Sequence, residues 1–304
     1  MSAILEVSTT QLAAIKCLIK YISTTITYCN IKFVSAHDDK SGCMTIVKLS
    51  EDKTVLIKTN LVSYQFDSFV CLEPVILIGV NMNILYQSIN KLNDKITFYL
   101  DKDDRTVLFV QDTHLSIPVP LIDLCEVTMP IPAIMFDSKI SISSRKFSKI
   151  CNKFTTDIQA VCNKMSLITG EMNYLCNSYA DNLEMRTINK ELISVVAKFQ
   201  TLANNYNHSI KISSVGNELN FTGPTHNIKL SSDSNKLEIR SPSDTINTID
   251  TREPQYDIKN LLNICLCDTL CNTFELFMKQ DFPLVIVISV ATLGKLYVFI
   301  TPIE

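Results

Sequence analysis

The chain has only six glycines among its 304 residues, and none of them sits in a phosphate-binding loop. Neither G-x-x-x-x-G-K nor G-x-G-x-x-G occurs, which excludes the two common nucleotide cradles. A secretory signal is also missing, because Gln11, Lys16 and Lys20 interrupt the first apolar stretch. No apolar run approaches the roughly 20 residues that a membrane span needs. We therefore expect an intracellular protein.

Strong charge of either sign is missing too. The formal net charge is −3, so any contact with nucleic acid must come from a local patch and not from bulk basicity. Hydrophobic residues make up 46 % of the chain and charged ones 19 %, which indicates a globular protein long enough for two domains. Its 11 cysteines are expected to be free thiols that fill small core sites.

No metal site or cofactor is predicted. Cys265 and Cys267 point about 200° apart on the helix expected there, so they cannot share an ion, and with Cys271 they are interpreted as core thiols. The acidic stretch 101–104 lacks the glycine and the distal glutamate of a calcium loop. We interpret it as a solvated hairpin turn.

Hydrophobic periodicity predicts one helix near each end of the first half. Pro118 and Pro120 cannot donate to a ladder, so the strand that contains them should lie at a sheet edge. The expected helices are 11–22 and 82–92, and the expected strands are 31–35, 45–50, 54–59, 68–72, 95–100, 106–110 and 114–121.

The second half begins with a strand, 139–142, and a helix, 145–154, whose outer arc carries Arg145, Lys146, Lys149 and Lys153 without an acid. A purely solvated face usually mixes signs, so this arc points to a polyanion. After it come a hairpin over 210–223, strands at 226–231 and 236–240, a short strand at Tyr256, a helix at 258–269, and strands at 282–290 and 296–300.

Several short motifs resemble the sliding clamps related to proliferating cell nuclear antigen. They are Gly79-Val80-Asn81-Met82, the apolar-acidic stretch 122–132, Phe147-Ser148-Lys149-Ile150-Cys151, Pro283-Leu284-Val285 after Asp281, and the terminal Pro302-Ile303-Glu304. Within that family the chain resembles the clamp-like proteins of asfarviruses, large DNA viruses that replicate in the host cytoplasm. The resemblance implies an α+β clamp fold: two similar domains, each with two helices packed on a curved antiparallel sheet, which assemble into a homotrimeric ring.

The expected division is an N-terminal domain, 1–121, an interdomain connector, 122–134, and a C-terminal domain, 135–304. Residues from about 157 to 206 have no counterpart in the family pattern and look inserted; they include a helix candidate, 190–203. Their basic residues are scattered, which favours a packing element over an added DNA or partner contact. An alternative register would make 190–203 the second-domain helix.

The function implied by the resemblance is that of a non-catalytic processivity factor that holds duplex DNA without sequence specificity. Phosphate contacts of this kind position a protein and weaken with salt. Gln87 and Asn90 stand where the family usually has lysines, so the basic load should be concentrated on helix 145–154. The DNA-contacting residues implied are Lys16, Lys20, Lys91, Arg145, Lys146, Lys149, Lys153 and Lys259.

The resemblance also implies a groove that binds short peptides of a DNA polymerase and of other replication or repair proteins, and a subunit interface formed by edge strands. Pro118 and Pro120 remove donors from that ladder. The groove residues implied are His37, Cys43, Met44, Ile122, Leu124, Met129, Ile131, Pro283, Phe299, Thr301 and Pro302. The interface residues implied are His114, Ser116, Pro118, Pro120, His226, Ile228 and Leu230.

Two alternatives stay open at this point. The first is a monomeric or weakly associated factor that holds DNA electrostatically, which the two edge prolines favour. The second is a thiol-dependent enzyme that uses Cys43 and His37, although no nucleophile motif accompanies them. A viral clamp is expected in the host cytoplasm, with the nucleus as the other compartment considered.

Overall fold

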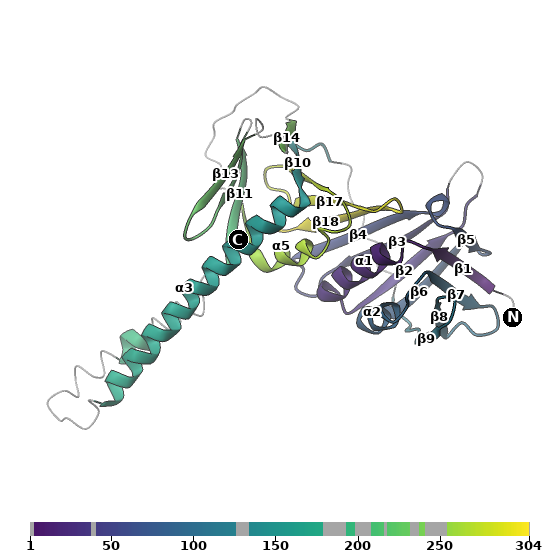
Figure 1. Cartoon of the computed structure of the whole chain (residues 1–304), viewed down its shortest axis with the longest axis horizontal. Coiled ribbons are helices and arrows are strands. Elements are labelled where there is room, and N and C mark those ends of the chain that lie inside the picture. Colours follow the sequence, from purple (N-terminus) through teal and green to yellow (C-terminus); the bar gives the residue numbers. More distant parts are fainter. Residues whose placement is uncertain are drawn as a thin grey trace.

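A nine-stranded antiparallel sheet runs through both halves of the chain in the computed structural model (Figure 1). The structure describes residues 3–37, 41–125, 134–178, 193–197, 208–215, 218–231, 237–240 and 254–303. The two halves join where β18 pairs with β4 in a continuous ladder from Gly294↔Leu61 to Ile300↔Val55. In order, this sheet contains β14 (Leu237–Arg240), β10 (Ser138–Ser143), β16 (Thr273–Met278), β17 (Leu284–Val290), β18 (Gly294–Ile300), β4 (Val55–Val62), β3 (Cys43–Leu49), β2 (Tyr28–Val34) and β6 (Val75–Asn81).

Each half adds a smaller antiparallel sheet of its own. The sheet of the first half ends in β9, so the prediction that the proline-containing strand is an edge is confirmed. The first-half sheet has the order β5 (Ser68–Cys71), β1 (Ala3–Thr9), β7 (Ile96–Asp101), β8 (Val107–Gln111) and β9 (Ser116–Pro120). The second-half sheet has the order β13 (Asn227–Ser231), β12 (Glu218–Thr222), β11 (Ser209–Val215) and β15 (Gln255–Asp257).

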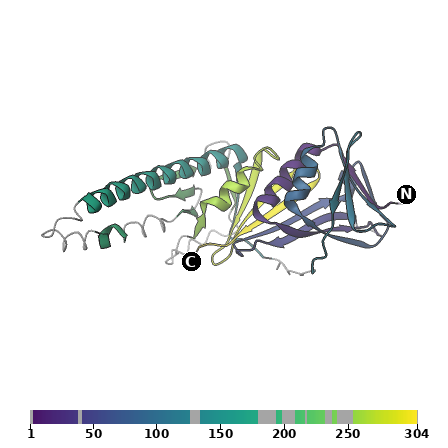
Figure 2. The same ribbon diagram turned by 90° about the horizontal axis from the view of Figure 1, so that it is seen from below.

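The helices lie together on one side of the sheets (Figure 2). Helix α1 packs against α2 in the first half and α3 against α5 in the second, while α1 also contacts α5 across the junction. This two-helix, curved-sheet plan in both halves confirms the predicted α+β clamp fold. The helices are α1 (Leu12–Thr25), α2 (Met82–Asn90), α3 (Ser144–Ser178) and α5 (Ile258–Cys265), with a 3-10 turn, η1 (Ser63–Gln65), before β5.

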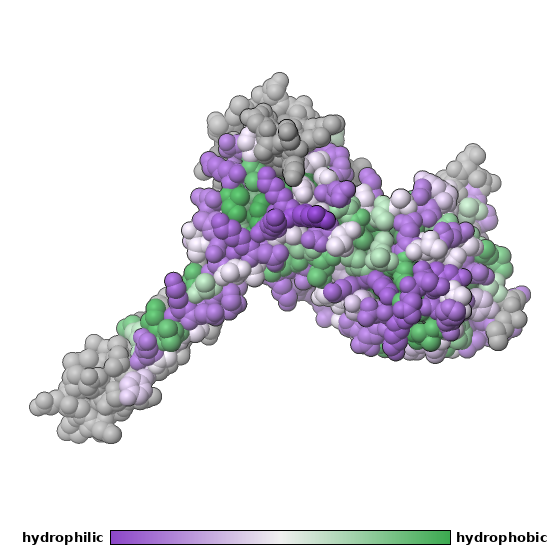
Figure 3. All heavy atoms as spheres, viewed as in Figure 1, coloured by the Kyte–Doolittle hydropathy of each residue, from purple (hydrophilic) through white to green (hydrophobic). Residues whose placement is uncertain are grey.

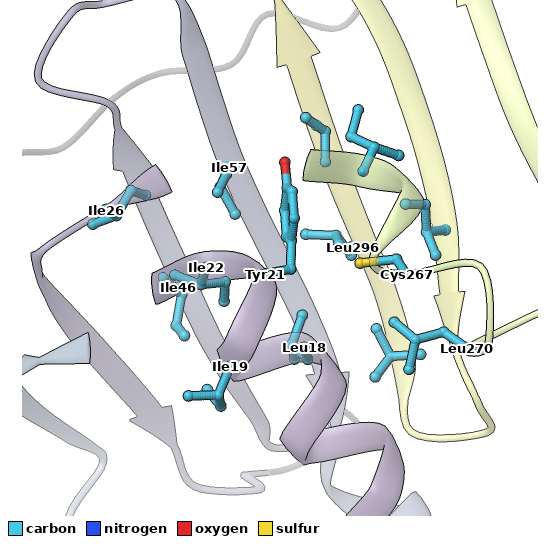
Figure 4. Close-up of a cluster of buried hydrophobic side chains, with 14 of the residues drawn as sticks. Leu18, Ile19, Tyr21, Ile22, Ile26, Ile46, Ile57, Cys267, Leu270 and Leu296 are labelled. Atoms are coloured by element: carbon cyan, nitrogen blue, oxygen red, sulfur yellow. The ribbon is translucent and has the colours of Figure 1, made fainter. Parts of the chain in front are cut away.

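A buried cluster at the junction seals the two halves together (Figure 4). Tyr21 and Leu18 from α1, Leu296 from β18 and Cys267 after α5 all have at most 1 % of their surface exposed. Burial raises the pKa of the Tyr21 phenol well above its usual value, so the ring is neutral. The junction is therefore held by apolar packing as well as by the strand pairing.

The predicted helix 145–154 is in fact the first third of α3, which has 35 residues. Its buried stripe continues past Phe154 to Ile158, and no proline or glycine interrupts the chain before Gly170. The hydroxyls of Thr155 and Thr156 bond to carbonyls four residues earlier, which a helix tolerates. The prediction was too short because it ended the helix where the resemblance ended. Of the candidate 190–203, residues 193–197 are helical and the others lie outside the described residues.

Three strands, β1, β6 and β16, were not predicted. No helix in the part of the chain that the structure describes has the length and apolarity that a membrane crossing needs.

Candidate functional site

The four helices form a layer that is rich in basic residues and poor in acidic ones. Helices α1, α2 and α5 contain no acidic residue, and α3 contains only Asp157 and Glu171. The same four helices carry eight lysine or arginine residues. Since the whole chain has a net charge of −3, its negative charge lies outside these helices. One face of the protein is thus a basic surface on an otherwise acidic molecule.

Most of the predicted cations point to solvent from this layer. Lys146 is half-buried along its stem, which leaves its charged end at the surface. The space-filling view shows hydrophilic side chains over much of this face (Figure 3). The exposed members are Lys20 on α1, Lys91 after α2, Arg145, Lys149 and Lys153 on α3, and Lys259 on α5.

Lys16 differs from the other members of the predicted DNA-contacting set. Its Nζ donates to the backbone oxygen of Asn90 at 3.1 Å and to that of Leu92 at 2.6 Å. These carbonyls end α2, where the helix dipole and unpaired oxygens favour a cation. Lys16 therefore joins α1 to α2, and its ammonium group is committed to that contact.

Asp157, the acidic residue nearest the basic arc of α3, lies against His226 of the turn between β12 and β13. His226 Nδ1 lies 3.0 Å from Asp157 Oδ2, and the imidazole stacks on Phe154 with ring centroids 4.6 Å apart. A Cβ at Gly223 would come within 2.4 Å of the Phe154 ring, so only glycine lets this turn approach so closely. His226 thus braces α3 within the chain, and its role as a subunit-interface residue stays a prediction.

On the opposite side of the sheet, the connector begins by pairing with β6. Ile122 N donates to Gly79 O at 2.8 Å, and a Cβ on Gly79 would lie 2.2 Å from Ile122 O. The Asn30 amide donates to Leu124 O at 3.3 Å. The glycine of the Gly-Val-Asn motif is required because the connector lies directly over it.

The chain after the connector is anchored on the same outer face of the sheet. Phe136 packs against Phe277 and Phe282 with ring centroids 5.3 and 5.9 Å away. Phe277 faces Val285, which in turn faces Phe299 in the strand register. The predicted groove residues Met129 and Ile131 fall outside the described residues.

Between these two anchors, the outer faces of β18, β4 and β3 carry half-buried side chains. Phe299 pairs with Leu56, and Tyr297 with Lys58, whose Nζ lies 6.0 Å from the Tyr297 ring centroid. We name this surface the docking face and define it as Val47, Leu56, Lys58, Tyr297 and Phe299. Only Phe299 was singled out from the sequence, although a strand period of two along β18, β4 and β3 would have found the others.

Met44 is wrong as a groove residue. It is 1 % exposed, and its neighbours Cys43 and Thr45 point to the outer face, because successive strand side chains alternate. Of the other predicted members, His37 is exposed and Pro283 and Pro302 are half-buried. Thr301 is fixed to the loop before β4, with its backbone nitrogen 2.9 Å from Thr54 O.

The β9 edge is unusual in its hydrogen-bonding groups. Leu121 N donates to Thr106 O, and Asp112 N to Leu115 O, at the two ends of the β8–β9 ladder. Because antiparallel pairing alternates, Ser116, Pro118 and Pro120 turn their backbone groups away from β8. The outward edge of β9 therefore offers carbonyls, but the two prolines supply no N–H. Their side chains and those of His114 and Ser116 are exposed, as an interface would require.

The second predicted interface strand, β13, is also a sheet edge. Gly223 N donates to His226 O, so His226, Ile228 and Leu230 turn their backbone groups toward β12. Leu230 is only 7 % exposed and belongs to the core. The backbone groups that face outward are those of Asn227 and Lys229, one residue out of phase with the predicted set.

The alternative of a thiol-dependent enzyme depends on Cys43 and His37. Burial raises the pKa of Cys43, which makes it a poor nucleophile, and no contact joins it to His37. The described residues also hold no group of three or more His, Cys, Asp or Glu side chains placed to bind a metal ion. Cys17 differs, because a hydrogen bond from Cys267 lowers its pKa to about 7 against the opposing effect of burial.

Comparison with known proteins gives consistent relatives, although no family model matches the chain. A protein of Acanthamoeba polyphaga mimivirus described as a probable DNA polymerase sliding clamp is 26% identical over 341 residues, covering 99% of this chain and 62% of the relative. The chain thus spans less than two thirds of that relative. The DNA polymerase sliding clamp of Pyrococcus furiosus is 26% identical over 140 residues, covering 45% of this chain and 54% of that clamp.

The fold is that of a solved structure. The crystal structure of proliferating cellular nuclear antigen from Entamoeba histolytica superposes with a TM-score of 0.70 at 16% identity, covering 100% of both chains. The viral source of the first relative agrees with the predicted viral origin. The particular resemblance to asfarvirus proteins stays a prediction.

Proposed function

We propose that this chain, which is similar in sequence and fold to DNA sliding clamps, is a processivity factor which surrounds duplex DNA and tethers replication and repair proteins to it. The observation that carries this proposal is the basic helix layer on a chain of negative net charge. Phosphate contacts from such a surface hold DNA without reading its sequence. The role needs no catalytic group, and the protein acts by binding alone.

A charge-reversal experiment tests the DNA contact. Replacing Lys146, Lys149 and Lys153 by glutamate should abolish retention on DNA, because each lost phosphate contact lowers the slope of log affinity against log salt by about 0.9. The matched control reverses three exposed lysines on sheet turns, Lys53, Lys102 and Lys279, and should leave the slope unchanged. Equal slopes for both variants would refute the proposed DNA face.

Assembly into a ring is the second element of the proposal. Both halves end in an edge strand, β9 and β13, and subunits that join these edges would form a closed homotrimer. A closed ring should stay on nicked circular DNA at high salt and slide off after linearisation. Light scattering of the free protein gives its oligomeric state in parallel.

The acceptor-rich edge of β9 supports a second candidate, a monomeric or weakly associated factor that holds DNA electrostatically. Such a protein would be lost equally fast from circular and linear DNA when the salt concentration is raised. A strictly monomeric species at high protein concentration would exclude the closed ring and favour this alternative.

We propose that partner proteins bind the docking face through short peptides with an apolar anchor. The face combines half-buried aromatic and aliphatic side chains with the connector along one side, which suits anchor residues of this kind. Val47→Glu should abolish stimulation of a replicative polymerase and leave DNA retention intact. The reversed lysines of α3 should impair both, so the two surfaces can be separated.

The proposed place of action is the site of viral DNA synthesis, in the host cytoplasm. Fractionation of infected cells would test this, since accumulation in the nucleus alone would contradict it.

A further inference from the structure

Helix α3 continues well beyond the body of the protein. Its buried stripe, Phe147, Cys151, Phe154 and Ile158, packs within the second half, whereas beyond Ile158 most of its described side chains are exposed. The ribbon shows this part projecting as an arm (Figures 1 and 2). Because the helix is continuous, the face that carries the basic arc keeps its orientation along the arm.

The outward face of α3 stays basic past the predicted arc. Lys164 follows Lys153 by eleven residues, which is about three helical turns, so both lie on one face about 16 Å apart. The exposed side chains between them include Gln159 and Asn163, whose amide groups can donate to phosphate oxygens.

This face has no exposed carboxylate from Arg145 to Lys164. The one acid in that interval, Asp157, is half-buried and lies against His226. Solvated helix faces normally mix the two signs, so a basic stretch of this length whose single acid is half-buried favours a polyanion. From Arg145 to Lys164 it measures about 28 Å, which is the rise of roughly eight base pairs.

We propose that the arm of α3 extends the DNA contact of the helix layer along the duplex outside the subunit body, with Lys164 as its outermost phosphate contact. The inference rests on the proposed function, because the basic arc at the start of the same helix must face DNA. Beyond Lys164 the exposed side chains Leu167 and Tyr174 are apolar or aromatic, so the surface that can contact phosphates ends at Lys164.

Lys164→Glu tests the inference in the full-length protein. Binding to a fluorescein-labelled 30-base-pair duplex is measured by anisotropy across a salt series, together with Lys153→Glu and the control Lys102→Glu. We expect Lys164→Glu to lower the salt slope by about one and the affinity several-fold, as Lys153→Glu does. Lys102→Glu changes the net charge equally but lies on the β7–β8 turn, and should have no such effect.

The outcomes separate the inference from the function on which it rests. If Lys164→Glu behaves like Lys102→Glu while Lys153→Glu still weakens binding, the arm does not contact DNA and the helix layer still does. If neither α3 variant differs from the control, the proposed DNA face itself is wrong. If Lys164→Glu has no effect on DNA but Tyr174→Ser reduces polymerase stimulation, the arm is a protein-docking element and the inference is overturned.

Discussion

The outward edge of β9 makes a prediction about subunit association that can be worked out in magnitude. Pro118 and Pro120 occupy the positions whose backbone nitrogens face away from β8, so they remove two donors from the edge that a neighbouring subunit would pair with. Replacing both with threonine restores these donors. The side chains are exposed, so the core is unchanged.

The expected gain follows from the net contribution of a backbone hydrogen bond, about 0.5–1.5 kcal/mol. Two restored bonds should therefore strengthen each interface by about 1–3 kcal/mol, which lowers the dissociation constant roughly 5- to 150-fold. Replacing the prolines also increases the conformational entropy of the unfolded chain, which lowers the free energy of unfolding by about 0.4–1 kcal/mol per residue. This loss affects folding and not the association of folded subunits.

Sedimentation equilibrium over a range of protein concentrations measures the change. Pro74→Thr is the matched control, because Pro74 is exposed and lies outside both edge strands. Ser116→Pro removes the donor that remains within β9 and should weaken association about tenfold at most. If the double threonine variant associates no more tightly and Ser116→Pro no more weakly than the original chain, β9 is not the assembly edge.

Three further predictions concern single residues. Lys16→Met should lower the free energy of unfolding by about 1 kcal/mol with little effect on DNA affinity. Lys20→Met should lower the DNA affinity and leave the free energy of unfolding nearly unchanged. Chemical denaturation measures the first quantity and fluorescence anisotropy the second. Gly79→Ala should speed amide exchange in the connector at Ile122, since the new Cβ clashes there; unchanged exchange would contradict the packing. The Cys17 thiol should alkylate with a midpoint near pH 7, because only the thiolate reacts, and Cys267→Ala should move that midpoint upward.

Much of the fold could be predicted from hydrophobic periodicity. Helices α1 and α2 were found within a few residues of their observed bounds, because each has a clear apolar stripe. The strand β6 was missed for the opposite reason. Its sequence, Val75–Asn81, is apolar without alternation, so it gives no period-two signal that would mark a strand. β1 and β16 were missed too, although both alternate between buried and more exposed positions.

The site was predictable where it depended on local sequence and not where it depended on register or tertiary contact. The exposed cations of α3 follow from helical spacing alone. Met44 was placed on the wrong face because its strand had to be phased from a turn, and a shift of one residue reverses every side chain. The role of Lys16 could not be read from sequence, since it depends on how closely α2 approaches α1.

DNA binding by the basic helix layer and subunit association through the donor-poor edge of β9 should be thermodynamically coupled. A ring whose interfaces lack two donors per ladder would open more easily, whereas DNA inside it would bridge the cations of neighbouring subunits and favour the closed state. Assembly and DNA binding would then be linked, and salt would weaken both together. Threonine at positions 118 and 120 should therefore make retention on circular DNA less sensitive to salt, although both positions lie in β9 and not on the helix layer. If salt sensitivity instead stays the same while the interface tightens, the ring is already closed in the original protein and the prolines are merely tolerated at its seams.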